Sequence, residues 1–390
     1  MSNPVSLALS DRKTGLLPVM EDSASSLSAH ETTGRMPVVH DRQDAYPPAN
    51  LPAMPPAPRL RVVVTTAVNH ADLNRLCPGG QLRWGRCDLL VNPPRGTACD
   101  YWIVFAGSRD RDQMACAPAN TLFIAGEPPS KKIYPKRFYA QFHRVVSTHA
   151  ADPHPRVTTS LPGLNWHVGL CRDDDRYHYG YDELKALGPG AKSNRISVVC
   201  SNLTTTAGQR RRLEFLRELK AALGEAIVHY GRGFTPVADK MEAILPHRFH
   251  LVLENSCSPD YWTEKLADAY LGWAHPINAG CPNLEDYFPP QGFTQVDVQR
   301  PREAVWIIRD LLAQPATAHE LATLARCRDL VLDTYNPFAR FAHWAELFHQ
   351  PGGPSQPVSI TTHKAFRPFP RGLLYRMKHR AAATAGSKPD

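Results

Sequence analysis

The feature that most constrains this chain is a series of short, almost uninterrupted apolar runs, rich in β-branched residues and separated by segments with helical patterning. The first group contains RLRVVVTTAV, DYWIVFAG, TLFIAGE and RVVSTH, and the second contains RISVVCSN, AIVHYG, FHLVLEN, HPINAG and FTQVDV. A strand that is apolar on both faces is typical of a parallel sheet covered by helices on each side. We therefore predict an α/β fold with two parallel sheets.

Composition divides the chain into four parts, because its 390 residues exceed one ordinary hydrophobic core. Residues 1–58 are rich in Ser, Asp, Thr and Pro, which predicts a disordered, Pro-rich segment. We place a first α/β domain at residues 59–175 and, after a polar connector, a second at residues 190–350. Residues 351–390 are predicted to form a basic C-terminal tail.

Net charge and cysteine content narrow the class of protein only a little. The formal charge of +8 favours an anionic partner, but the cations are scattered and do not distinguish nucleic acid, lipid and phosphorylated small molecules. The nine cysteines include no C-x-x-C pair, which predicts reduced, mostly buried thiols. No apolar signal-peptide core and no run of roughly 18 apolar residues is visible. We expect a cytoplasmic protein, in peripheral contact with the inner membrane at most.

Polar side chains follow three of the predicted strands. Asn202 ends VVCSN, Glu254 and Asn255 end FHLVLEN, and Glu127 ends TLFIAGE. Ligands of an open parallel sheet bind at the carboxyl ends of its strands. Any one of these groups is explained equally well by a turn or a cap, but three strand ends of this kind indicate a ligand site.

Two predicted helices begin with cations, where the helix dipole disfavours them. Thr263 is a candidate N-cap, Glu264 and Lys265 follow it, and the other helix opens with Arg210–Arg212. A cation in a first turn costs roughly 0.3 to 1 kcal/mol. Helix N-termini bind phosphate, so two such sites favour a phosphate ligand over side chains that only extend into water. Near a bound nucleotide, Glu264 can accept from ribose hydroxyls, and Tyr261 can offer its hydroxyl to a phosphate or its ring to a base.

The common nucleotide and metal motifs are missing from the sequence. It contains no GxxxxGK[ST] loop and no complete GxGxxG fingerprint, which argues against a P-loop enzyme or a dinucleotide-dependent dehydrogenase. It also contains no metal-ligand cluster and no DxD-like pair at a strand end. We therefore predict neither a bound metal nor a required cofactor.

The stretch FHLVLENSCSPDYWTEKLADAYLGWAHPINAGCPNLEDYFP resembles the signature of family-10 glycosyltransferases, the α1,3/4-fucosyltransferases. In outline, that signature reads F-x-x-x-F-E-N-S, a variable gap, Y-V-T-E-K, an amphipathic helix, V-P-V-x-x-G and P-N-x-x-x-Y. This chain has Leu253 in place of the second Phe and Trp262 in place of the Val. Animal members carry an N-terminal membrane anchor, and in lacking one the chain resembles the bacterial type.

The resemblance implies a GT-B architecture, in which two Rossmann-like domains with parallel sheets face a cleft. The C-terminal domain would hold GDP-fucose, and the N-terminal domain would hold the acceptor. The implied catalytic base is Glu127. The implied donor-binding residues are Arg212, Asn255, Tyr261, Glu264 and Lys265, with Arg211 as the alternative to Arg212 and with Asn202 and Glu254 as neighbours.

From the resemblance we expect an inverting glycosyltransferase that moves L-fucose from GDP-fucose to a glycan hydroxyl, without a metal held by protein ligands. Glu127 would take the acceptor proton, while Arg212 and Lys265 would stabilise the diphosphate. The alternatives are another GDP- or UDP-sugar as donor and a non-catalytic glycan- or nucleotide-binding protein. Nucleic-acid binding would rest on net charge alone, and we do not expect it. The basic, aromatic segment Phe366–Arg380 can instead contact anionic lipid, where a lipid-linked acceptor would lie.

Overall fold

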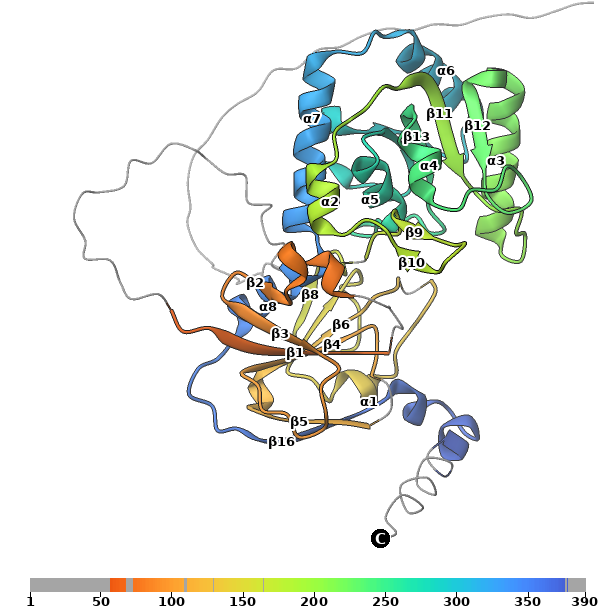
Figure 1. The fold of residues 1–390 in the computed structure, drawn as a ribbon. Coiled ribbons are helices and arrows are strands. Elements are labelled where there is room, and N and C mark those ends of the chain that lie inside the picture. Colours follow the sequence, from red (N-terminus) through yellow and green to blue (C-terminus); the bar gives the residue numbers. More distant parts are fainter. Residues whose placement is uncertain are drawn as a thin grey trace, which may run out of the picture. The chain divides into compact units, whose positions relative to one another are not determined.

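The structure is a computed structural model that describes residues 57–67, 73–108, 111–128, 130–163, 165–375 and 377. The segment predicted to be disordered, residues 1–58, lies almost wholly outside these ranges, as does the end of the predicted tail. Two mainly parallel sheets with flanking helices dominate the described residues (Figure 1). The predicted α/β class is therefore confirmed.

The first sheet has the strand order β2-β3-β1-β4-β6-β7-β8. Its strands are β1 (Leu60–Thr66), β2 (Arg83–Trp84), β3 (Cys87–Val91), β4 (Tyr101–Phe105), β6 (Thr121–Ile124), β7 (Arg144–Ser147) and β8 (Val157–Thr159). All neighbours are parallel except β2 and β3. The sequence predicted β1, β4, β6 and β7 and missed β2, β3 and β8, since those three are only partly buried and lack a continuous apolar run.

Helix α8 (Pro337–Phe348) covers one face of this first sheet, against β1, β2, β3 and β4. It begins at Pro337 because the Asn336 side chain accepts from the N–H of Phe338. The ring of Phe341 lies 5.3 Å from that of Phe105 in β4, measured between centroids. The sequence analysis assigned residues up to 350 to the second domain. That assignment fails for α8, because the apolar stripe of α8 packs against the first sheet.

The opposite face of the first sheet is covered by a second apolar cluster. Trp102 and Val104 of β4 pack there with Tyr134 and with Phe138 of α1 (Lys136–Tyr139). Strand β5 (Arg111–Cys116) contributes to the same cluster and pairs antiparallel with β16 (Gln356–Thr361). The beginning of the predicted C-terminal tail thus contains a strand that pairs with the first half of the chain.

The connector between the two halves is more ordered than its polar composition predicts. It contains the hairpin of β9 (Leu170–Cys171) and β10 (Arg176–Tyr177), followed by α2 (Tyr181–Ala186). Buried Asp268 accepts from the backbone N–H groups of His167 and Val168, at 2.7 and 2.9 Å. Its other oxygen accepts from Lys240 at 2.6 Å. These bonds hold the start of the connector against α5.

The second sheet has the order β12-β11-β13-β14-β15, and all its neighbours are parallel. Its strands are β11 (Ser193–Val199), β12 (Ile227–Tyr230), β13 (His247–Leu253), β14 (His275–Ala279) and β15 (Thr294–Gln295), and each was predicted. The helices of this half are α3 (Ala207–Leu223), α4 (Lys240–Ile244), α5 (Glu264–Leu271), α6 (Pro301–Ala313) and α7 (Ala318–Asp329), which continues as a π-helical turn (Leu330–Thr334). Two Rossmann-like halves with a returning last helix correspond to the predicted GT-B architecture.

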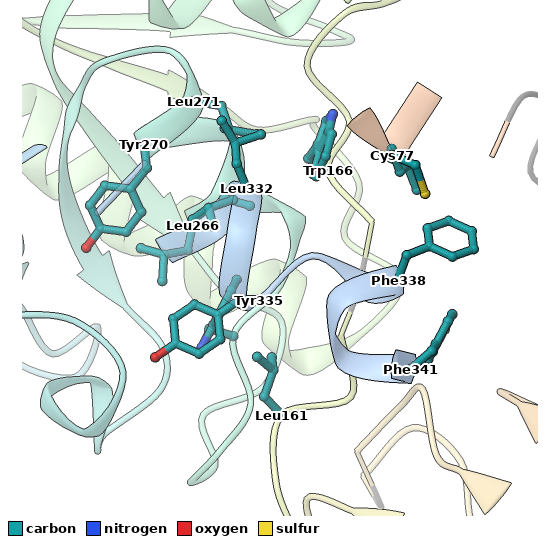
Figure 2. Close-up of a cluster of buried hydrophobic side chains, with 14 of the residues drawn as sticks. Cys77, Leu161, Trp166, Leu266, Tyr270, Leu271, Leu332, Tyr335, Phe338 and Phe341 are labelled. Carbon is teal, nitrogen blue, oxygen red and sulfur yellow. The ribbon is translucent and has the colours of Figure 1, made fainter. Parts of the chain in front are cut away.

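One apolar cluster contains residues from α5, from the π-helical turn and from α8 (Figure 2). Leu266 and Tyr270 come from α5, Leu332 from the turn, and Phe338 and Phe341 from α8. The cluster also includes core residues of the first sheet, so α8 connects the two cores by burial of apolar surface.

Two further predictions can be compared with the described residues. All nine cysteines are free thiols and six of them are buried, as predicted. Over the described ranges, no helix is both long and apolar enough to cross a bilayer.

Candidate functional site

A pocket of about 440 Å³ lies at the carboxyl edge of the second sheet, where the sequence predicted a ligand site. Its lining comes from the ends of β13, β14 and β15 and from the first two turns of α3 and α6. The residues with functional side chains or close backbone approaches are Gly208, Arg211, Arg212, Glu254, Asn255, Gly280, Asp297 and Glu303.

The start of α3 is positioned by its own capping chemistry and by a glycine. Thr206 accepts from the N–H of Gln209 at 3.2 Å, and the Gln209 side chain accepts from the N–H of Thr206 at 3.0 Å. A Cβ at Gly208 would lie 2.9 Å from the carbonyl oxygen of Asn255. Only glycine lets the first turn of α3 approach the end of β13 this closely, which brings the arginines to the pocket.

Of the three consecutive arginines of α3, Arg211 and Arg212 line the pocket. Arg210 instead donates to the carbonyl oxygen of Thr204, at 2.8 Å, and stays with its own loop. Arg212 Nη1 donates to the carbonyl oxygen of Leu253 at 3.2 Å, while its buried Nε has no hydrogen-bond partner among the described residues. Arg212 is therefore fixed in orientation and keeps a donor for a ligand.

Below the pocket, the buried carboxylate of Glu254 joins β13 to α5. Its Oε1 accepts from the N–H and the hydroxyl of Thr263, at 3.0 and 2.6 Å. Its Oε2 accepts from Lys265 Nζ at 3.3 Å, and the same ammonium donates to Glu264 Oε1 at 3.0 Å. Thr263 also accepts from the N–H of Lys265, so the predicted N-cap is confirmed.

These contacts give a different explanation for the presence of a lysine, Lys265, in the first turn of α5. The prediction explained a cation in the first turn by a bound phosphate, whereas the structure places Glu254 and Glu264 beside it. Burial would lower the pKa of Lys265, but the two carboxylates raise it above its usual range. Burial would likewise raise the pKa of Glu264, but Lys265, Lys240 and His167 hold it well below its usual range. Lys265 and Glu264 are therefore both charged at neutral pH.

The candidate base Glu127 follows β6 and contacts residues on both of its oxygens. Its Oε1 accepts from Lys131 Nζ at 2.5 Å, and its Oε2 accepts from the hydroxyl of Tyr261 at 3.4 Å. Burial and the nearby Glu127 raise the pKa of Tyr261, so this hydroxyl stays protonated and can donate. Trp262, the next residue, is buried and packs against Phe288.

The predicted site residues thus fall into three groups. Arg211, Arg212, Glu254 and Asn255 line the pocket, and Glu264 and Lys265 connect to it through Glu254. Tyr261 and Glu127 form a pair of their own. Asn202 does not line the pocket: its backbone bonds to Arg232, and its side chain lies against Gly233.

Two sets of residues were missed by the sequence analysis. Asp297 and Glu303 line the pocket, but nothing in their local pattern distinguishes them from other surface carboxylates. In the β9–β10 hairpin, ligand atoms of Cys171, Asp174 and His178 all lie within 4.8 Å of one another. No metal cluster was predicted, because this spacing contains no paired cysteines. A hydrogen bond of 2.8 Å between the side chains of Asp174 and His178 explains why these two residues lie close together.

The second half of the chain is similar to known proteins. The model for glycosyltransferase family 10 (fucosyltransferase), C-terminal region, matches residues 190–317, which contain the whole second sheet and the pocket. Over 123 residues the chain is 35% identical to 3-galactosyl-N-acetylglucosaminide 4-alpha-L-fucosyltransferase FUT3 of Bos taurus, over 30% of this chain and 32% of that protein. Over 131 residues it is 32% identical to 4-galactosyl-N-acetylglucosaminide 3-alpha-L-fucosyltransferase FUT6 of Homo sapiens, over 32% of this chain and 35% of that protein. The matches thus span about a third of the length of these relatives.

A solved structure described as alpha1,3-fucosyltransferase with GDP aligns with a TM-score of 0.38 and 16% identity, over 74% of this chain and 96% of that chain. This score is too low to decide the fold, which rests on the strand order and connections described above. Residues 190–317 are thus similar to the C-terminal region of glycosyltransferase family 10, the fucosyltransferase family.

Proposed function

We propose that the protein is an inverting glycosyltransferase that moves L-fucose from GDP-fucose to a hydroxyl of a glycan acceptor. The observation that carries this proposal is the pocket at the carboxyl edge of the second sheet, inside the residues that match the family. Its volume of about 440 Å³ falls within the usual range for small-molecule sites. It combines two arginines with the N-terminus of a long helix, a combination suited to a diphosphate.

Arg212 is the proposed primary contact of the donor diphosphate, with Arg211 beside it. The N-terminus of α3 adds backbone N–H groups, whose partial positive charge also attracts the diphosphate. Asn255 can donate or accept a hydrogen bond at the pocket wall. As negative charge develops on the leaving diphosphate, a guanidinium that is already oriented stabilises it without reorganising. These features support Arg212 over Arg210, whose side chain bonds to its own loop.

Glu264 and Lys265 are also proposed donor-binding residues, but Lys265 already forms ion pairs with two carboxylates. Lys265 is shared between two carboxylates, so a phosphate must compete with Glu254 and Glu264 for its ammonium. Glu264 is charged at neutral pH and can accept from a ribose hydroxyl. We propose no metal-dependent step, since each role is assigned to a side chain of this chain.

Glu127 is the proposed general base. Lys131 occupies Oε1 at 2.5 Å, whereas Oε2 has only the longer contact of 3.4 Å with Tyr261 among the hydrogen bonds of the described residues. Oε2 is therefore the oxygen that would take the acceptor proton while the acceptor oxygen attacks the anomeric carbon opposite the diphosphate. The Glu127–Lys131 ion pair also favours one alternative, a non-catalytic binding protein in which this carboxylate is structural.

We also propose that the protein is cytoplasmic and meets a lipid-linked acceptor at a membrane surface. The residues near the C-terminus support this part: Phe369 is 82% exposed, Leu374 and Met377 are each 60% exposed, and Arg367 and Arg371 lie among them. Exposed apolar side chains flanked by cations favour contact with anionic lipid.

A panel of nucleotide sugars tests the proposed function. Release of free nucleotide is measured with GDP-fucose, GDP-mannose, UDP-galactose and UDP-N-acetylglucosamine, each with and without a mixture of glycan acceptors. We expect release from GDP-fucose alone, and a product whose anomeric configuration, read by NMR, is opposite to that of the donor. Binding of GDP without release from any sugar would instead support the non-catalytic alternative.

A further inference from the structure

Basic side chains gather at the carboxyl edge of the first sheet, next to Glu127, and the proposed transfer step uses none of them. Gly107 follows β4 with a φ of 116°. A Cβ at that position would lie 3.4 Å from Nδ1 of His363 and 3.8 Å from Nζ of Lys132. Lys132 Nζ also donates to the carbonyl oxygen of Ala106 at 3.1 Å. An ammonium and an imidazole therefore converge over the end of β4.

The charge at this place is unbalanced. Burial lowers the pKa of Lys132, and the nearby Lys364 and Arg367 lower it further. Across the ranges that the structure describes, none of these three cations forms a salt bridge. Glu127 is the carboxylate that faces Lys132, but its Oε1 is already paired with Lys131. Like charges held together in this way are relieved by an anion.

Within this cluster, the ring of His363 is held in place by packing but lacks a hydrogen-bond partner. Its ring packs edge-on against Tyr134 at 5.3 Å and Phe138 at 5.8 Å, so its orientation is set by the core. Burial and the three neighbouring cations lower the pKa of His363 to about 4, and the ring is neutral at neutral pH. Its buried Nδ1 has no hydrogen-bond partner within the described part of the chain, and neither has the buried hydroxyl of Ser108, which follows Gly107.

We infer that Lys132, His363, Lys364 and Arg367 bind an acidic group of the acceptor glycan, a carboxylate or a phosphate ester. This inference rests on the proposed function, because it takes Glu127 as the place where the acceptor hydroxyl reacts. The donor pocket is lined by residues 208–307 and has its own arginines, so this cluster in the first half is not needed for the donor diphosphate. Hydrogen bonds between cations and an acidic group are about twice as strong as neutral ones, which makes the acidic group a determinant of specificity.

The test uses three disaccharides that differ only at C6 of the terminal galactose: N-acetyllactosamine, its 6′-carboxylate and its 6′-phosphate. Calorimetry measures their affinities for the full chain without donor, and transfer from GDP-fucose gives their KM values. The variant is Lys364→Ala/Arg367→Ala, in which both side chains are exposed. The matched control is Lys136→Ala/Arg137→Ala, which removes the same charge from the exposed side of α1.

We expect the wild-type chain to bind one or both acidic disaccharides at least about tenfold more tightly than the neutral one. The Lys364→Ala/Arg367→Ala variant should bind the acidic disaccharides about tenfold more weakly. Its affinities for GDP and N-acetyllactosamine should change by less than about twofold, and all affinities of the control variant should also change by less than about twofold. Preference for the carboxylate or for the phosphate identifies the acidic group.

Two results would overturn the inference: equal affinity for all three disaccharides, or a loss of GDP affinity in the Lys364→Ala/Arg367→Ala variant, which would assign the cluster to the donor. Failure of the proposed function has a different signature. In that case no nucleotide sugar supports transfer, while the preference for acidic disaccharides and its loss in the variant can still be measured.

Discussion

Replacing Lys265 with alanine removes the cation that lies between two carboxylates below the pocket. In the folded chain its ammonium is 3.3 Å from Glu254 Oε2 and 3.0 Å from Glu264 Oε1. The Glu254 side chain is only 1% exposed. The helix-dipole argument alone expects this substitution to leave stability unchanged or slightly raised, since a misplaced charge is removed. The observed contacts predict the opposite.

The expected size of the effect follows from what remains around Glu254. Breaking a buried ion pair by removing one partner costs about 3 to 5 kcal/mol. Here Thr263 still donates its N–H and its hydroxyl to Glu254, which reduces the penalty. We therefore expect Lys265→Ala to lower the free energy of unfolding by about 2 to 3 kcal/mol at neutral pH.

The loss should depend on pH with a defined sign. The pKa of Glu264 is depressed in the folded state, so its stabilising contribution is present above its unfolded pKa of about 4.3 and is lost as pH falls below that value. The pKa of Lys265 is raised, so its contribution is complete below its unfolded pKa of about 10.4 and is lost only at higher pH. The difference between the two proteins should thus be constant near neutral pH and should shrink in acid.

Urea unfolding without nucleotide, at about pH 7 and at about pH 4, measures this difference. Lys220→Ala, which removes an exposed lysine from α3, serves as the control and should change stability by less than about 0.5 kcal/mol. If Lys265→Ala is as stable as the wild type at neutral pH and loses only GDP affinity, the ion-pair argument is wrong and phosphate is the partner of Lys265.

Three further substitutions separate the proposed roles. Glu127→Gln keeps the shape and removes the base, so turnover at saturating substrates should fall about 10²- to 10⁴-fold with GDP affinity nearly unchanged, and near-normal turnover would remove this residue from the mechanism. Arg212→Ala should weaken GDP binding in calorimetry by about 1.5 to 3 kcal/mol, whereas Arg210→Ala should not, and equal losses would contradict the pocket assignment. Asp268→Asn should lower the free energy of unfolding by about 3 kcal/mol because the half-buried Lys240 loses the buried carboxylate that is its ion partner, and an unchanged urea midpoint would show that this anchor contributes nothing.

The sequence by itself determined the second sheet, the helix starts around it and the resemblance of residues 190–317 to family-10 glycosyltransferases. Its central strands β11 and β13 contain runs of apolar and β-branched residues, such as ISVV and LVL, so burial on both faces is recorded locally. Thr263 and Pro301 begin their helices through capping preferences that need no distant partner. The pocket residues Glu254 and Asn255 were predictable because the carboxyl ends of parallel strands share one edge.

The strands of the first half were harder to predict from local sequence patterns. Strands β2, β3 and β8 are short or only half-buried, and their sequences do not separate them from loops. Strand β16 is mostly polar and forms only because β5, more than 200 residues earlier in the chain, offers it a partner. Such pairings depend on long-range contacts, which a local pattern does not contain.

Only the tertiary structure decided which partner each charged and amphipathic residue has. The apolar stripe of α8 indicates that it packs, but not that it covers the first sheet. Lys265 looks like an unpaired cation in the first turn of a helix until β13 brings Glu254 beside it. His363 and Lys132, distant in sequence, converge over Gly107 because the 3-10 turn His363–Phe366 packs beside α1. The sequence shows locally which side chains should be buried or paired. The atoms that they contact belong to distant parts of the chain, so only the folded structure identifies them.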